Sequence, residues 1–131
     1  MIARFKDDFT PENITLSGKN APPQPLKAHI KGETIVDGTK FPPQNETKLT
    51  EILLEFECTD ALLEYIRRYS YAIERVPKID DLMFNIELRA QESVMRIYGA
   101  MFSEVNLPGL DSPTKVPAVA HIHHEYFTIE Y

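Results

Sequence analysis

The C-terminal segment 119–131, VAHIHHEYFTIEY, contains three of the four histidines of the chain, His121, His123 and His124. Imidazole groups are common protein ligands for zinc and other transition metals. Because successive side chains of a strand point to opposite faces, His121 and His123 share one face of a predicted strand and His124 lies on the other. His121 and His123 are therefore a candidate half-site for a metal ion.

A zinc site needs three or four protein ligands, and the remaining histidine, His29, lies in a distant segment whose partner in the fold is unknown from the sequence. A polar strand face at a sheet edge or a subunit contact explains the same residues more simply. We therefore predict no metal and no other cofactor, and retain His121 and His123 as the residues to test if a metal binds.

The carboxylates and serines of the sequence do not occur in a pattern that is typical of a catalytic site. Glu51, Glu55 and Glu57 alternate with apolar residues and so project from a strand face, whereas catalysis by paired carboxylates needs a shielded pocket that raises one pKa. No serine lies in a nucleophile elbow, and the segment LSGKN lacks the remaining glycine and the Ser/Thr of a phosphate-binding loop. The sequence does not predict an enzyme.

Composition limits the classes of function further. The 131 residues, 43% apolar and 26% charged, predict a single globular domain spanning 1–131. No apolar run is long enough to span a bilayer and the N-terminus has no signal-peptide pattern, so we expect a protein that works inside a cell, away from membranes. The formal charge of −6 argues against a nucleic-acid-binding surface. We expect the lone Cys58 to be a small buried hydrophobe.

Period-two alternation predicts most of the fold. A short strand is expected around Ile14 and Leu16, followed by an extended proline-rich connector, APPQP. Residues 26–36 alternate again, and Asp37-Gly38 predicts a two-residue hairpin turn. Residues 51–58 form the clearest strand, with one apolar and one acidic face.

The period then changes to that of an amphipathic helix, which begins with Thr59 or Asp60 as its N-cap and ends at Pro77. Alternation returns in residues 82–89 and in an antiparallel partner at 94–102. The last strand begins after Pro117, and its apolar parity breaks near His124-Glu125, which predicts a bend where the strand leaves one sheet and joins another. The expected fold class is mainly β with one α-helix, as a β-sandwich or barrel flanked by that helix.

This order of elements resembles the bacteriophage tail tube proteins, whose fold is shared with secretion-system tube proteins. The similarity lies in a strand that leads directly into one helix at LEFECTDALLEYIRRY, a hairpin at LMFNIELRAQESVMRIYGAMFSEV, and a long last strand at AVAHIHHEYFTIEY. It covers most of the chain as an order of elements, without a residue signature, and is therefore an analogy of fold.

The resemblance implies a structural virion protein that forms hexameric rings, which stack into a tail tube for genome ejection. Its partners would be copies of itself and a sheath or baseplate protein, with DNA passing transiently, and it would be assembled in the host cytoplasm. An acidic lumen would repel DNA and keep it mobile. The candidates for lumen-facing residues are Glu51, Glu55, Glu57 and Glu87.

Two alternatives stay open. Another tail component with the same fold, such as a tube initiator, a terminator or a baseplate subunit, would differ from a tube protein in how far it polymerises. A small metal- or ligand-binding β-barrel that uses His121 and His123 would instead be a stable monomer.

Overall fold

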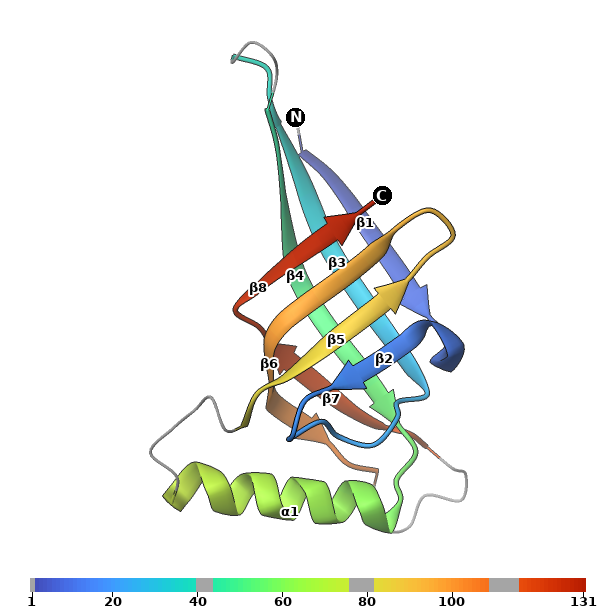
Figure 1. Ribbon diagram of the computed structural model, residues 1–131, viewed down its shortest axis with the longest axis vertical. Coiled ribbons are helices and arrows are strands. Elements are labelled where there is room, and N and C mark those ends of the chain that lie inside the picture. Colours follow the sequence, from blue (N-terminus) through green and yellow to red (C-terminus); the bar gives the residue numbers. More distant parts are fainter. Residues whose placement is uncertain (1, 40–43, 76–81, 109–115) are drawn as a thin grey trace.

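In the computed structural model the chain forms a curled antiparallel sheet shaped as a half-barrel, with one α-helix across one end (Figure 1). The structure describes residues 2–39, 44–75, 82–108 and 116–131. The predicted class, mainly β with one flanking helix, is confirmed. The elements in chain order are β1 (Ile2–Phe9), the 3₁₀ helix η1 (Pro11–Asn13), β2 (Ile14–Ser17), β3 (Lys27–Asp37), β4 (Gln44–Phe56), α1 (Asp60–Arg75), β5 (Phe84–Arg89), β6 (Val94–Asn106), β7 (Ala118–His123) and β8 (Tyr126–Glu130).

The strands follow the order β1-β3-β4-β7-β6-β5-β2, and β8 pairs with β6 beside that path. The long strand β6 belongs to both parts of the sheet, because its second half pairs with β7 and its first half with β5 and β8. We call β1, β3, β4, β7 and the second half of β6 sheet A. Sheet B consists of β2, β5, the first half of β6 and β8.

The chain crosses from sheet A to sheet B at His124 and Glu125, between β7 and β8. The backbone N–H of Glu125 donates to the carbonyl of Tyr98 on β6 at 3.0 Å. The next residue on β6, Gly99, has φ +65°. The bend predicted from the parity break is therefore confirmed, and the last strand does join another part of the sheet.

The helix α1 closes one end of the half-barrel (Figure 1). Thr59 caps it, because its Oγ1 accepts a hydrogen bond from the N–H of Leu62 at 3.2 Å. Leu62 and Tyr69 are buried against the sheet, which explains the apolar stripe of the helix. The predicted stop at Pro77 lies outside the described residues.

An aromatic cluster joins the helix to both parts of the sheet. Its centre is Phe102 on β6, whose backbone carbonyl accepts a hydrogen bond from the Tyr69 hydroxyl at 2.9 Å. Four rings lie with their centroids 5.3 to 6.1 Å from that of Phe102, those of Phe56, Tyr65, Tyr69 and Phe84. Such tilted and edge-on contacts add to the burial of the rings and hold the helix on the sheet.

Strands β3 and β4 form a hairpin that extends beyond the rest of the molecule (Figure 1). Their pairing runs to Asp37 opposite Gln44, so more than two residues separate the paired ends of the two strands. The predicted two-residue turn at Asp37-Gly38 is wrong, although the hairpin itself is confirmed. A type I′ turn needs positive φ at both central residues, and Gly38 does not have it.

Two further details differ from the predictions. The structure contains β1, which the sequence does not indicate because only Phe5 and Phe9 give its inner face apolar character. Cys58 is exposed rather than buried, since β4 ends at Phe56 and the alternation does not continue to it.

Candidate functional site

Two of the proposed lumen residues, Glu51 and Glu55, lie on the face of β4 that points away from the core, on either side of the buried Ile52 and Leu54. Each has a basic partner on β3. Lys31 Nζ lies 3.6 Å from Glu51 Oε1, and His29 Nε2 lies 3.0 Å from Glu55 Oε2. These two glutamates therefore share one surface, but their charges are partly compensated.

The other two candidates lie elsewhere. Glu57 follows β4 and is exposed, whereas Glu87 is on β5, in sheet B. Glu87 faces two arginines, with Arg96 Nη2 at 3.4 Å and Arg89 Nη2 at 3.6 Å. Arg96 also lies 2.8 Å from Glu130. Glu51 and Glu55 are thus on sheet A, Glu87 is on sheet B and Glu57 lies after the end of β4, so the four glutamates are not all on one face of one sheet.

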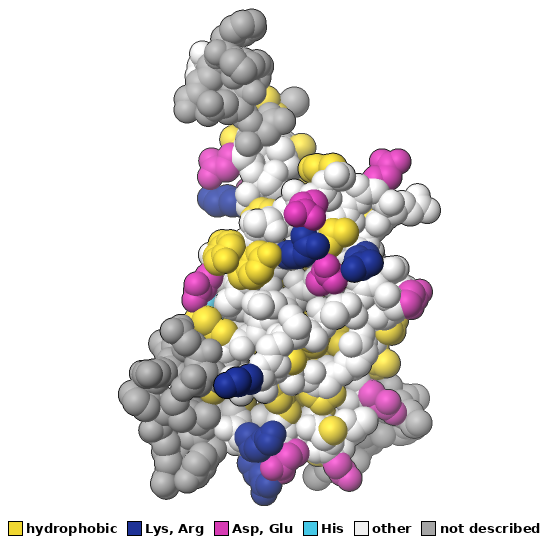
Figure 2. All heavy atoms as spheres, viewed as in Figure 1, with side chains coloured by type: hydrophobic (Ala, Val, Ile, Leu, Met, Phe, Trp, Pro, Cys, Tyr) yellow, Lys and Arg dark blue, Asp and Glu magenta, His cyan; other side chains and the backbone are white. Residues whose placement is uncertain are grey.

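Figure 2 shows the face of the molecule that sheet B covers, and acidic and basic side chains lie interspersed on it. Such mixed pairs at a surface have only a small effect on stability, about 0–1 kcal/mol each. The described residues on this face form no large area of a single charge sign.

The histidine pair does not extend to a metal site. His121 lies opposite Leu53 on β4, and Leu53 lies opposite His29 on β3, so two strand spacings of about 4.8 Å separate the two histidines. A zinc ligand needs a free ring nitrogen, and both ring nitrogens of His29 already contact carboxylates, those of Asp8 and Glu55. Among the residues that the structure describes, no three His, Cys, Asp or Glu side chains are grouped to hold a metal ion.

His124 lies in the bend between β7 and β8, where its ring contacts Phe127 at a centroid distance of 6.2 Å. Burial lowers the pKa of His124, and the neighbouring His123 lowers it further. Both effects favour the neutral imidazole, and the position is therefore consistent with a packing role at the corner.

A cluster that the sequence reading missed surrounds His29. Its Nδ1 lies 2.6 Å from Oδ1 of Asp8 on β1, while its Nε2 contacts Glu55 on β4. Burial lowers the pKa of His29, but the hydrogen bonds to Glu55 and Asp8 outweigh burial and the net shift is upward. The hydrogen bond between His29 and Asp8 also lowers the pKa of Asp8. The sequence gives little indication of this cluster, because Asp8 and His29 meet only through the pairing of β1 with β3.

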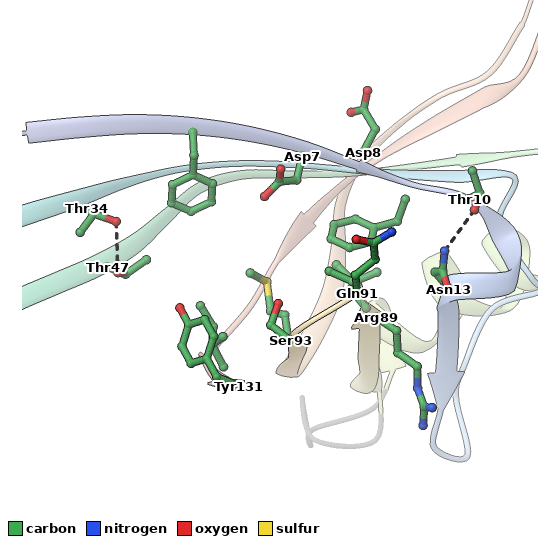
Figure 3. A pocket seen from close by; sticks show the side chains of 16 residues that line it. Asp7, Asp8, Thr10, Asn13, Thr34, Thr47, Arg89, Gln91, Ser93 and Tyr131 are labelled. Carbon is green, nitrogen blue, oxygen red and sulfur yellow. Dashed lines mark hydrogen bonds between the residues drawn. The ribbon is translucent and has the colours of Figure 1, made fainter.

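A pocket of about 660 Å³ opens at the end of the half-barrel opposite the helix (Figure 3). Strands β1, β3 and β4 line one side of it, and the β5–β6 connection and β8 line the other. Asp7 and Asp8 point to opposite sides of β1, so the neighbouring carboxylates face different surroundings. Apolar side chains in its lining are Phe5, Phe9, Leu88, Met95 and Ile129.

Three strands have one backbone edge without a partner among the described residues, β1, β8 and the short β2, which pairs only with β5. β1 pairs only with β3, and β8 pairs only with β6. Six of the eight residues of β1 are exposed. Large apolar side chains are exposed on β1 and β8, with Ile2 at 59% and Tyr126 at 56%. Rows of free N–H and C=O groups beside exposed apolar side chains are a template for pairing with another strand.

Comparisons of the chain with protein-family models, with curated proteins and with solved structures found no match. Within the described residues, no helix is both long enough and apolar enough to cross a membrane.

Proposed function

We propose that the chain is a structural subunit of a bacteriophage tail tube, which assembles into rings by pairing the β1 edge of one copy with the β8 edge of the next. Rings would stack into a conduit for DNA in the virion tail after assembly in the host cytoplasm. The role is structural rather than catalytic. The six-fold symmetry and the sheath or baseplate partner rest on the resemblance to tail tube proteins alone.

The observation that carries the proposal is that β1 and β8 each have an open edge on a half-barrel. A contact between two different edges is heterologous, and repeating it closes a ring when the rotation between copies allows it. Edge-to-edge pairing would satisfy the free backbone groups of β1 and β8 and would cover Ile2 and Tyr126. The projecting β3–β4 hairpin would then extend from the ring towards neighbouring copies.

The charges favour a lumen that repels DNA weakly rather than strongly. Of the four candidate lumen residues, Glu51 and Glu55 lie on one surface of sheet A. These two would line a lumen formed by that surface. Their partners Lys31 and His29 reduce the local negative charge. The net charge of −6 per chain still opposes tight binding of a polyanion.

The test is negative-stain electron microscopy of the purified chain over a concentration series, with a mass determination on the same samples. Tubes of uniform diameter are the expected result. Discrete rings that do not stack would instead identify a tube initiator, a terminator or a baseplate subunit. A monomer at every concentration would contradict the proposal.

A pair of matched variants tests whether the β1 edge carries the assembly. Ile2→Lys places a charge on the edge strand, and lysine on an edge is a common device against strand pairing. Leu63→Lys places the same charge on α1, which belongs to neither open edge, at a side chain that is 42% exposed. We expect Ile2→Lys to raise the threshold concentration for assembly by about tenfold or more. Leu63→Lys should leave this threshold unchanged.

The pocket favours a second candidate function, binding of a small amphipathic ligand by a monomeric half-barrel. Its volume lies within the range of about 300–1,000 Å³ that is usual for ligand sites, and barrel mouths are frequent locations for them. A monomer that binds an apolar fluorescent probe, and loses this binding when Ser93→Trp fills the pocket, would favour this candidate over the tube subunit.

A further inference from the structure

The two hydrogen bonds of His29 determine its protonation state in this conformation. An ionised carboxylate can only accept hydrogen bonds, and His29 contacts Asp8 at 2.6 Å and Glu55 at 3.0 Å through different ring nitrogens. Both nitrogens must therefore carry a proton. The bridge contains a positively charged imidazolium between two carboxylates, and a neutral ring could donate to only one of them.

The bridge connects three adjacent strands. Asp8 lies directly opposite His29 in the pairing of β1 with β3, and Glu55 belongs to β4 on the other side of β3. On this outer face only one other ion pair is formed between β1 and the described residues, Arg4 with Glu33 at 3.4 Å. The Arg4 side chain is 83% exposed, so this second ion pair is largely screened by solvent.

The other groups around His29 cannot replace the bridge. Lys6 on β1 and Lys27 and Lys31 on β3 carry ammonium groups, which have no acceptor atom and cannot accept a hydrogen bond from the ring. On β4, Leu53 lies opposite His29 and separates it from His121 of β7, while Glu51 is paired with Lys31. A deprotonated ring nitrogen would point its lone pair at a carboxylate oxygen, and one arm of the bridge would have to open.

We propose that His29 is a proton-dependent clamp on the β1 edge, which holds β1 in position for pairing with a second copy when it is protonated and loosens β1 when it loses its proton. The part that concerns assembly rests on the proposed function. The part that concerns β1 does not, because it is a property of the single chain.

The direction of the pH effect follows from the two groups. The pKa of His29 is raised above 6.5, so the clamp is fully present below pH 6.5 and is lost as the pH rises through the higher folded value. The pKa of Asp8 is lowered below 3.8, so its arm is present above pH 3.8 and is lost as the pH falls through the lower folded value. The clamp is therefore closed in mildly acidic solution and opens as the pH rises through the raised pKa of His29.

Amide hydrogen exchange of the full chain at about pH 5.5 and pH 8.5, expressed as protection factors, tests the clamp directly. The measurement is made at a concentration below the onset of association. We expect protection of the β1 amides to fall roughly twofold to fivefold at the higher pH, the size expected for opening a partly exposed ion pair, while β4 and β7 do not change. In His29→Gln this pH dependence should disappear.

The matched control is His121→Gln, which removes a histidine from the same face of sheet A without touching the bridge. It should behave as the wild type. If His29→Gln fails to fold by circular dichroism, Asp8→Asn replaces it and should likewise abolish the pH dependence of β1. A wild type whose β1 protection is equal at both pH values, or a folded His29→Gln or Asp8→Asn variant that keeps the wild-type response, would overturn the proposal.

The threshold concentration for assembly, measured at the same two pH values, separates the clamp from the proposed function. Assembly should weaken at the higher pH in the wild type and in His121→Gln, and His29→Gln should lose most of this difference. If His29→Gln kept the wild-type change of threshold concentration with pH, the proposed link between the clamp and assembly would be wrong. If no copy associates at either pH, the proposed function fails, while hydrogen exchange in β1 still decides the clamp.

Discussion

The side chain of Glu125 occupies the space in which Gly99 would carry a Cβ atom. A Cβ at position 99 would lie 2.6 Å from Cγ and 2.8 Å from Cδ of Glu125. Gly99 also has φ +65°, in the left-handed region that residues with a Cβ rarely adopt. Because this contact lies where β6 bends and β7 passes into β8, it allows the two parts of the curled sheet to meet.

Gly99→Ala should therefore destabilise the protein. The added methyl group meets Glu125 and the backbone is held at positive φ, a conformation that costs about 1–3 kcal/mol for residues other than glycine. Gly38→Ala is the matched control, since nothing lies within 4 Å of a Cβ at that position, and it should change stability by less than about 0.5 kcal/mol. Urea unfolding measures both, and equal effects of the two changes would contradict the account of the corner.

The hydrogen bond from Tyr69 to the backbone of Phe102 gives a second prediction about stability. Tyr69→Phe keeps the ring in the aromatic cluster and removes only the buried hydroxyl, so it should lower the free energy of unfolding by about 0.5–1.5 kcal/mol. Tyr131→Phe removes a hydroxyl from a residue that is 96% exposed and should have no measurable effect. Thermal and urea unfolding of the two variants would show the difference, and an unchanged Tyr69→Phe would indicate that water replaces the lost bond.

The alternation of apolar and polar residues accounts for the parts of the fold that could be predicted. Ile52, Leu54 and Phe56 are all buried in β4, as their spacing indicates. The parity break at His124-Glu125 predicted the crossing between the two sheets, because apolar residues on both sides of it need to reach the core. Local patterns of this kind require no knowledge of which strands pair.

The candidate site could not be predicted because it depends on pairing between distant segments. Asp8 and His29 are 21 residues apart and meet only in the register of β1 with β3. β1 itself has little alternation, since most of its residues are exposed on both faces. Similarly, the division of Glu55 and Glu87 between two sheets follows from the path of β6 through both of them, which no single segment reveals.

Histidine titrations followed by NMR should show a raised pKa for His29 and a lowered pKa for His124. The carboxylates that flank His29 place its pKa above 6.5, whereas burial and the neighbouring His123 place that of His124 below 6.5. In Asp8→Asn the pKa of His29 should fall, because one of the two acceptors that stabilise the imidazolium is lost. If His124 titrated above His29 in the wild type, the bridge would not exist in solution as described.

The close packing of Phe5 on Gly32 gives a prediction about the position of β1. Phe5 and Gly32 are directly paired, and a Cβ on Gly32 would lie 2.3 Å from Cζ of Phe5 and 2.7 Å from the carbonyl oxygen of Lys48. Gly32→Ala should therefore destabilise the protein by about 1–3 kcal/mol and increase amide exchange in β1, as overpacking requires neighbours to shift.

Combining Gly32→Ala with Phe5→Ala distinguishes the two contacts. Phe5→Ala removes the ring, but the Lys48 carbonyl belongs to the backbone of β4 and remains in place. The double variant should therefore stay less stable than Phe5→Ala alone, by an amount that urea unfolding can measure. If adding Gly32→Ala had no effect in the Phe5→Ala background, the aromatic ring alone would explain the need for glycine, and strand β4 would have room to accept a side chain at this position.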